Sequence, residues 1–578
     1  MRIAGLVVVA LLIAIGAWFA FRSRPVPVIV EDPRLTFSTP YLNVHPDVKY
    51  VGDAACVGCH AEIAGHYAKH PMGRSASVAN GEAHSFTKSN MRFSIEPRDG
   101  KVFHRQEMLS EKGEVVASIE RWVSFAIGSG TRGRSYITVA DGFVHQSPIS
   151  WFHDKQLWDL SPGFAVDQGF KRPIPSECLF CHVNHVEPIP TMINQYREPL
   201  FDGLSIGCER CHGPGILHVE RQTKGEKYDG GDFTIVNPRD LKPELRESVC
   251  QQCHLQGEKR IVRRGREPFD FRPGLPIEQF YSTFVRVPEL LENYRSVGQY
   301  EQMEVSRCSQ GSNGELGCIS WHDPHRLPGD NERVEYYRNR CLKCHQDKGC
   351  SVSVVDRKAK QTDDSCIACH MKKGDSTSIV HAAVTDHRIL RQPEPVIKRN
   401  VAIDPSVIPI RNFHDGSTFL SDDEKKRDLG IALSRLGVLN GLKAFPLTRQ
   451  SLRLLEPSIK KWPTDIAAKL ARAESLRMAT DYPNALALAD DVLKSEPGNE
   501  SALVVRLACL DLMRRTDEAR TVAEQLETLN PYQSAYPLWI AQYEMSRGDR
   551  VKAQQVIDRA LRLDAFSQTG RELAKRLH

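Results

Sequence analysis

The sequence predicts a multidomain chain. A cysteine- and histidine-rich region with little regular structure and a small antiparallel β insert is followed by an all-α solenoid. The length of 578 residues exceeds what one compact core supports, so two or three domains are expected. Fifteen of the 16 cysteines lie between Cys56 and Cys369, and only Cys509 lies beyond them. From about Ser421 the chain becomes rich in Ala, Leu, Arg and Glu and repeats every 34 residues.

The composition excludes several classes of protein. Hydrophobic residues make up 41% and charged residues 26% of the chain, which argues against a disordered chain and against a polytopic membrane protein. The formal net charge is only +5, from 77 basic and 72 acidic side chains. This balance gives little reason to propose a nucleic-acid partner.

The N-terminus carries an export signal. An uncharged apolar run from Ile3 to Phe21 is roughly long enough to cross the hydrocarbon core of a bilayer as a helix. Residues 1–22 are therefore either a cleaved signal peptide or a retained membrane anchor, and the length of the run favours the anchor. A Pro-rich linker is expected over 23–49. We expect a periplasmic or extracytoplasmic protein, tethered to the inner membrane.

One cysteine motif, C-x-x-C-H, occurs six times. It is the attachment signature of haem c, because two thiols one helical turn apart add to the haem vinyl groups and the adjacent histidine binds the iron. A zinc site or a disulfide framework would not need a histidine after every second cysteine. The six sets are Cys56, Cys59, His60; Cys178, Cys181, His182; Cys208, Cys211, His212; Cys250, Cys253, His254; Cys341, Cys344, His345; and Cys366, Cys369, His370. Residues 50–395 are therefore predicted to form a haem-dominated multihaem cytochrome c domain.

A seventh site departs from the motif. Cys318-Ile-Ser-Trp321-His322 keeps the first cysteine and the histidine but has Trp where the second cysteine belongs. We expect a haem held there by one thioether at Cys318, with His322 on the iron. The alternative is a lost site, with Cys308 and Cys318 joined as a disulfide. A disulfide between Cys308 and Cys350 would instead leave Cys318 free for haem.

A low-spin electron-transfer haem needs a second strong axial ligand. His185 and His325 each follow a proximal histidine by three residues, where they are better placed to bind a neighbouring haem than the same iron. The candidate distal ligands are His70, His185, His218, His325, His381 and His387, and weaker candidates are His66, His84, His104, His145 and His153. An ordinary surface histidine is the alternative for each of them.

Residues 85–155, between the first and second motifs, have a different sequence pattern from the motif-bearing segments. Period-two alternation predicts a small antiparallel sheet covering one flank of the haem group, with hairpin turns at Asp99-Gly100 and Asp141-Gly142. The segment 128–133 matches G-x-G-x-x-G, but no βαβ unit or following helix supports nucleotide binding. A tight turn is the better interpretation.

The C-terminal region, residues 426–578, is predicted to follow a linker over 396–425. The residues that keep the 34-residue spacing include Pro463, Pro497 and Pro531, and also Ala485, Ala519 and Ala553. A period of 34 with small residues inside and Pro at the end is typical of tetratricopeptide repeats, which are paired antiparallel helices. An unrelated helical bundle is the alternative. Such a solenoid presents a concave surface, and we expect it to dock a redox partner protein.

Motifs and repeats together resemble exported multihaem cytochromes c fused to C-terminal tetratricopeptide repeats. The haem domain is similar to the tetrahaem carrier that accepts electrons from hydroxylamine oxidoreductase. The segments that carry the resemblance are 174–182, 208–215, 322–325 and 385–388, and Gly128-Ser-Gly130 with Ser135-Tyr136 also looks like a family element. The resemblance covers roughly residues 50–578 and implies bis-His haems and a redox function. In such proteins the Cys318 site is normally a full C-x-x-C-H.

The leading hypothesis is an electron-transfer protein with six haems and a seventh at Cys318. Haems spaced every 45 residues or so between Cys56 and His370 would form a relay closed to substrate. The rival is an enzyme that acts on a small nitrogen or sulfur species at one five-coordinate haem, sought first at the Cys318 site. A third interpretation is a repeat protein in which the haems are purely structural. It ranks last because six or seven haems are more than a structural role would require.

Overall fold

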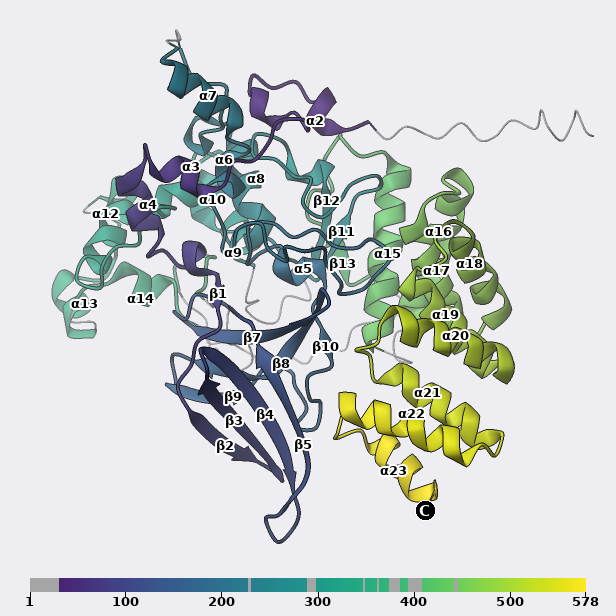
Figure 1. Ribbon diagram of the computed structural model, residues 1–578. Helices are drawn as coiled ribbons and strands as arrows, with labels where there is room; N and C mark the ends of the chain where they lie inside the picture. Colours follow the sequence, from purple (N-terminus) through teal and green to yellow (C-terminus); the bar gives the residue numbers. More distant parts are fainter. Residues whose placement is uncertain are drawn as a thin grey trace, which may run out of the picture.

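The computed structural model describes residues 31–226, 230–287, 298–346, 349–360, 363–373, 385–392, 408–440 and 445–577. It has N-terminal β-sheets, a middle region of short helices and a C-terminal all-helical region (Figure 1). The predicted membrane anchor and His381 lie outside these ranges. Within the described ranges, no helix is both long and apolar enough to cross a membrane.

The β insert consists of two antiparallel sheets rather than the single small sheet that was predicted. One sheet has the order β2 (His84–Lys88), β3 (Met91–Arg98), β4 (Lys101–Leu109) and β5 (Val115–Val123). The other has the order β1 (Ala76–Val78), β6 (Phe125–Ile127), β7 (Gly133–Ala140), β8 (Phe143–Phe152) and β10 (Arg172–Pro173), and β9 (Leu157–Leu160) also pairs with β8. Apolar side chains from both sheets share one core.

The alternation along β3 explains this packing. Met91, Phe93 and Ile95 are at most 1% exposed and enter the core, since successive side chains of a strand point to opposite faces. Both predicted hairpin turns are confirmed. Asp99 and Gly100 have φ of 51° and 71°, and Asp141 and Gly142 have 49° and 77°, the two consecutive positive values of a type I′ turn. Residues 128–133 join β6 to β7 as a turn with no helix after it.

The region with the cysteine motifs consists of short helices and one small sheet. Its helices are α2 (Pro33–Thr36), α3 (Asp53–Val57), α4 (Ala61–Tyr67), α5 (Ser176–Leu179), α6 (Glu209–His212), α7 (Ile216–Lys224), α8 (Pro243–His254), α9 (Gln299–Glu304), α10 (Arg307–Gly311), α11 (Cys318–Trp321), α12 (Arg333–His345), α13 (Val354–Lys360) and α14 (Cys366–His370). The sheet has the order β11 (Lys259–Val262), β12 (Tyr281–Arg286) and β13 (Ile410–Asn412).

Parts of both predicted linkers are packed against this region. In the N-terminal linker, Tyr41 and Val44 are buried in an apolar cluster, and the Asn43 amide donates to the carbonyl of His212 at 2.9 Å. In the second linker, Ile410–Asn412 forms strand β13, with Ile410 buried. The sequence predicted linkers over 23–49 and 396–425, but a few apolar side chains attach part of each segment to the neighbouring core.

The repeat prediction is confirmed as a series of paired antiparallel helices. The helices are α15 (Asp422–Asn440), α16 (Phe445–Lys461), α17 (Ile466–Met478), α18 (Tyr482–Ser495), α19 (Glu500–Leu512), α20 (Thr516–Leu529), α21 (Ala535–Ser546), α22 (Arg550–Leu563) and α23 (Gln568–Leu577). Pro463, Pro497 and Pro531 each stand two residues after a second helix ends. Ala485 and Ala519 are fully buried, so small side chains let neighbouring helices approach closely.

The solenoid is docked along the N-terminal part of the chain through successive inter-helix connections. At the start of α19, Glu500 accepts the N–H of Ile193 at 3.0 Å. One repeat later, the ring of Tyr532 packs on Phe143 at 5.4 Å. One further repeat along, Phe566 is 1% exposed and belongs to the core of the β insert. The repeats are therefore attached to the β insert and not extended away from it.

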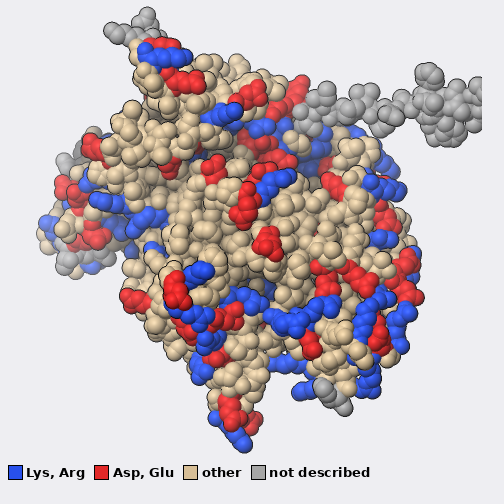
Figure 2. Space-filling model, in the orientation of Figure 1, with Lys and Arg blue, Asp and Glu red and all other residues tan. Residues whose placement is uncertain are grey.

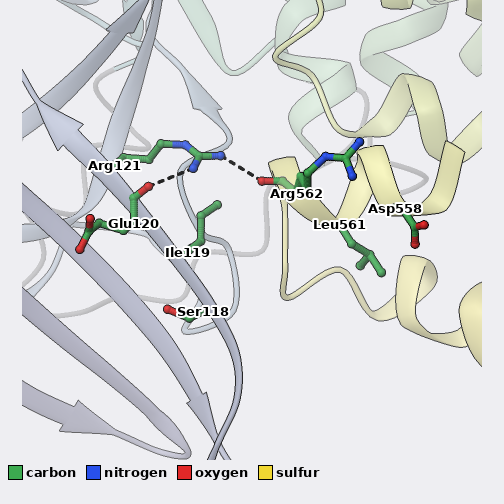
Figure 3. Close-up of a pocket in the computed structure, with 7 residues that line it drawn as sticks. All are labelled: Ser118, Ile119, Glu120, Arg121, Asp558, Leu561 and Arg562. Carbon is green, nitrogen blue, oxygen red and sulfur yellow. Dashed lines mark hydrogen bonds between the residues drawn. The ribbon is translucent and has the colours of Figure 1, made fainter. Parts of the chain in front are cut away.

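An open groove of about 500 Å³ lies between β5 and α22 (Figure 3). The Arg121 guanidinium crosses it and donates to the backbone carbonyl of Arg562 at 3.2 Å and to that of Glu120 at 3.0 Å. Burial lowers the pKa of Arg121. The groove is thus bridged by the same docking contact that joins the repeats to the β insert.

Candidate haem-binding site

Each cysteine motif begins on a single helical turn. In the first motif the N–H of His60 donates to the carbonyl of Cys56 at 2.9 Å, and in the third the N–H of His212 donates to that of Cys208 at 3.1 Å. The same bond joins His322 to Cys318 at 2.9 Å. These turns place the cysteine and histidine side chains on one side of a short helix, as thioether attachment and axial ligation of the same group require.

Thiols of different motifs lie within hydrogen-bonding distance of each other. The four contacts join Cys56 to Cys208, Cys181 to Cys253, Cys250 to Cys318, and Cys341 to Cys366. In addition, Cys211 lies close enough to Cys250 and Cys253 for their charges to interact. The motifs therefore form a connected series in space: first, third and fourth, with the second motif and the Cys318 site both beside the fourth.

Among the residues that the structure describes, three pairs of imidazole rings face each other across a gap. The ring centroids of His60 and His218 are 6.4 Å apart with an interplanar angle of 19°. Those of His212 and His325 are 6.0 Å apart at 9°, and those of His322 and His387 are 6.4 Å apart at 37°. A metal–imidazole bond is about 2 Å long. Two rings on opposite sides of one metal therefore have centroids roughly 6 to 6.5 Å apart.

The second ring nitrogen of several histidines is held by a hydrogen bond. Nδ1 of His212 lies 2.8 Å from the Val236 carbonyl oxygen, that of His370 2.8 Å from the Leu390 oxygen, and that of His387 2.8 Å from the Thr385 oxygen. Nδ1 of His218 lies 2.7 Å from a carboxylate oxygen of Asp232. Such a bond fixes the ring orientation and leaves Nε2 for a metal. The donor set fits haem c.

Burial keeps several of these imidazoles neutral, as a metal ligand must be. Desolvation lowers the pKa of His322 to about 4. It also lowers the pKa values of His212, His325 and His387. The uncharged ring is therefore favoured at neutral pH.

The Cys318 site is held by an acidic side chain of α8. Glu247, which is 5% exposed, accepts the N–H of Cys318 at 3.2 Å and the Nε–H of Arg246 at 2.9 Å. Ligand atoms of Glu247, Cys250 and Cys318 lie within 4.8 Å of one another. The indole N–H of Trp321 is buried and has no acceptor among the described residues.

Neither predicted disulfide near this site is present. Cys308, Cys318 and Cys350 are all free thiols. Cys308 lies near Cys344 of the fifth motif, and the charge of Cys344 raises its pKa in addition to the effect of burial. Cys350 lies beside Arg357 instead. The predicted disulfide between Cys308 and Cys350 was wrong, because sequence spacing does not determine which thiols approach each other.

The remaining candidate ligands lie in other environments. Nδ1 of His70 accepts the N–H of Met72 at 3.2 Å, and its charge interacts with that of His254. The ring of His185 packs edge-on against Phe269 at 5.0 Å. His104, one of the weaker candidates, is fully buried in the β insert, with Nδ1 2.7 Å from the hydroxyl of Ser147.

The residues between the two cysteines of a motif connect neighbouring motifs. Glu209 of the third motif is 2% exposed, and its carboxylate accepts the N–H of Gly52, which caps the helix of the first motif, at 2.8 Å. Asp53 in turn accepts the N–H of Cys208 at 2.8 Å. Arg210 donates to the Phe180 carbonyl of the second motif at 2.9 Å. The sequence motif does not indicate these contacts, because C-x-x-C-H specifies no residue type at its two middle positions.

Comparisons with known proteins agree with a cytochrome. Residues 165–213, which contain the second and third motifs, match the family of cytochrome c554 and c-prime. A search of curated proteins gives no match. The family match fits a c-type cytochrome.

Several solved structures match part of this chain at low TM-scores. A MamA D159K mutant is 21% identical, with 26% of this chain and 81% of that chain covered and a TM-score of 0.22. MamA from Desulfovibrio magneticus RS-1 is 18% identical, with 26% and 93% covered and a TM-score of 0.22. A thermophilic TPR protein from Thermus thermophilus is 22% identical, with 26% and 82% covered and a TM-score of 0.22.

Proposed function

We propose that this protein is an exported multihaem c-type cytochrome that carries electrons between redox partners. Haem c supplies a reversible one-electron change at iron, and paired imidazoles close that iron to substrate. The observation that carries the proposal is the set of three facing imidazole pairs at 6.0 to 6.4 Å. We infer six haems at the full motifs and a seventh at Cys318, held by one thioether.

The facing rings also suggest which histidine is the distal ligand of which haem. His218, His325 and His387 would bind opposite His60, His212 and His322 respectively. Each of these distal ligands follows a motif other than the one it serves. The remaining proposed distal ligands are His70, His185 and His381.

The proximity of the motifs supports a relay. Thiol contacts connect the first motif to the third and the fourth motif to the Cys318 site, and His322 packs on Tyr337 of α12 at 6.0 Å. Helix α12 carries the fifth motif, whose Cys341 contacts Cys366 of the sixth. A continuous path would therefore run from the first motif to the fifth and sixth.

The location and the role of the repeats are proposed from the sequence. Residues 1–22 would tether the protein to the inner membrane, with the body on the periplasmic or extracytoplasmic side. The solenoid would hold a redox partner protein or a larger complex on its face away from the β insert.

The decisive experiment is electron paramagnetic resonance of the oxidised holoprotein, with haems counted by intact mass. Seven haems are expected, and the six for which a distal histidine is named above should be low-spin. His387→Ala should convert one haem to high-spin, whereas His414→Ala, which alters a half-buried histidine outside the facing pairs, should convert none. Cys318→Ala should remove one haem mass, and Cys308→Ala should remove none. Six haems in the native protein would eliminate the Cys318 site.

An enzyme with one open haem is the second candidate. The sequence placed that haem at Cys318, but His387 faces His322 there, so the structure favours another position. His345 of the fifth motif is exposed, and among the described residues it is one of the proximal histidines that no imidazole ring faces. A high-spin signal integrating to one haem in the native protein, lost in His345→Ala, would support an enzyme acting on a small nitrogen or sulfur species.

A further inference from the structure

The fifth and sixth motifs lie in a part of the chain with little packing of its own, here named the terminal lobe and defined as the described residues from 307 to 373. Among these residues, no apolar side chain is buried. Cys344 and Cys369, the second cysteines of the two motifs, are exposed, and so is His345. The haems proposed at these motifs would thus be close to solvent.

Large apolar side chains of the terminal lobe are also exposed. Leu342, adjacent in sequence to the fifth motif's Cys341, is 38% exposed. Val354 and Val355 on α13 are 51% and 78% exposed. Large apolar side chains gathered on one surface are typical of an interaction site, because their desolvation stabilises a complex.

The terminal lobe is also basic. Its described residues include eleven basic and eight acidic side chains, an excess of three positive charges, and from 333 to 373 the excess is five. Within the described part of the chain, six exposed cations there make no ion pair, namely Arg333, Lys343, Lys358, Lys360, Lys372 and Lys373. Several blue side chains are visible on this lobe at the left of Figure 2.

The opposite end of the proposed relay has a different charge. Around the first motif, residues 47–74 contain three basic and three acidic side chains and are neutral overall. Cys59 and His60 are exposed there as well. Exposure is therefore common to both ends, whereas the positive charge belongs to the terminal lobe alone.

We propose that the terminal lobe is the docking surface for an acidic electron-transfer protein. The exposed leucine and valines would form the dry centre of the complex, and the unpaired lysines and arginine around them would attract a partner of opposite charge. Complementary charge mainly raises the rate of association and falls in effect with salt. This proposal rests on the proposed electron-transfer function, to which it adds the chemistry of one partner and its place of contact.

Stopped-flow reduction of the oxidised holoprotein by flavodoxin hydroquinone, an acidic one-electron donor, tests the docking surface. Each productive encounter oxidises the anionic hydroquinone to the neutral semiquinone and reduces one ferric haem to the ferrous state. We expect the second-order rate constant to fall with ionic strength and to fall about tenfold in Lys358→Glu/Lys360→Glu. Val354→Ser/Val355→Ser should also slow the reaction, without changing its dependence on salt.

The matched control is Lys112→Glu/Lys155→Glu, because it reverses two exposed charges in turns of the β insert and makes the same change in net charge. Its rate constant should stay within about twofold of the native value. An equal loss in both charge-reversal variants, or no loss in the terminal lobe variant, would overturn the docking surface. Complete reduction of every variant by excess dithionite shows that the haems are intact, and its failure in the native protein would overturn the electron-transfer function instead.

Discussion

The solenoid and the terminal lobe contain helices of equal length with opposite packing. Helices α12 and α19 each have 13 residues. Helix α19 buries seven side chains, including Leu503 and Leu507, whereas α12 buries none. An isolated helix of this length is marginal in water, so most of its stability must come from tertiary packing. The solenoid supplies that packing from its own sequence.

The difference indicates where the haems contribute to folding. Helix α12 ends in the fifth motif, whose Cys341 and Cys344 would bond covalently to a large apolar group. Burial against that group would replace the apolar core that the terminal lobe lacks. The cysteine motifs would then be structural as well as functional in this lobe, whereas the solenoid has an apolar core of its own.

Removal of haem should have the largest effect, because it should unfold helix α12 of the terminal lobe and leave helix α19 of the solenoid folded. In the full chain made without haem attachment, we expect amides of α12 to exchange at rates close to those of an unfolded chain. Amides of α19 should keep protection factors of at least about 10³, because their core is unchanged. Hydrogen exchange read by mass spectrometry measures both helices in one sample. Protection of α12 without haem would contradict the structural role of the group.

Truncation of Phe566 should weaken the packing between the solenoid and the β insert and so lower the free energy of unfolding. Phe566→Ala deletes a ring that is 1% exposed, and we expect it to cost about 3–5 kcal/mol of unfolding free energy. The control is Tyr532→Phe, one repeat earlier, which removes only an exposed hydrogen bond to Asp141 and should cost about 1 kcal/mol or less. Urea unfolding measures both values. Equal costs would show that Phe566 does not join the two cores.

Acid should destabilise the β insert through His104. Burial lowers the pKa of this fully buried histidine to about 3. The unfolded chain binds a proton there below about pH 6.5, whereas the folded chain does not until about pH 3, so stability falls as the pH falls through this window.

The expected slope for His104 is up to about 1.4 kcal/mol per pH unit. His104→Gln should flatten the pH dependence of urea unfolding relative to the native protein. His84→Gln, which changes an exposed histidine on β2, should leave it unaltered. If both variants follow the native curve, the His104 imidazole is not held neutral.

Those elements that depend on local periodicity could be predicted from the sequence. The alternation at Met91, Phe93 and Ile95 indicated the strands, and the spacing of Pro497 and Pro531 indicated the helix pairs. Prediction failed where distant segments meet. That the β insert has two sheets depends on which strands pair within residues 76–173. That Phe566 completes its core depends on contacts between residues hundreds of positions apart.

The residues of the candidate site also fall into those that local sequence predicts and those that depend on distant contacts. The motifs name their own cysteines and proximal histidines, because attachment requires adjacent residues. The identity of a facing ring such as His387, 65 residues after His322, depends on how the chain folds back. Glu209 and Arg210 connect motifs from positions that the motif leaves unspecified, so no pattern could identify them in advance.

The docking contacts of the solenoid constrain how many repeats the protein can have. Glu500, Tyr532 and Phe566 mark three successive connections, and each meets a different feature: the segment at Ile193, the turn before Phe143, and the core of the β insert. Duplicating or deleting an internal unit would displace every later connection by one position. Repeat arrays commonly vary in copy number, but here the count is matched to the shape of the surface beneath it.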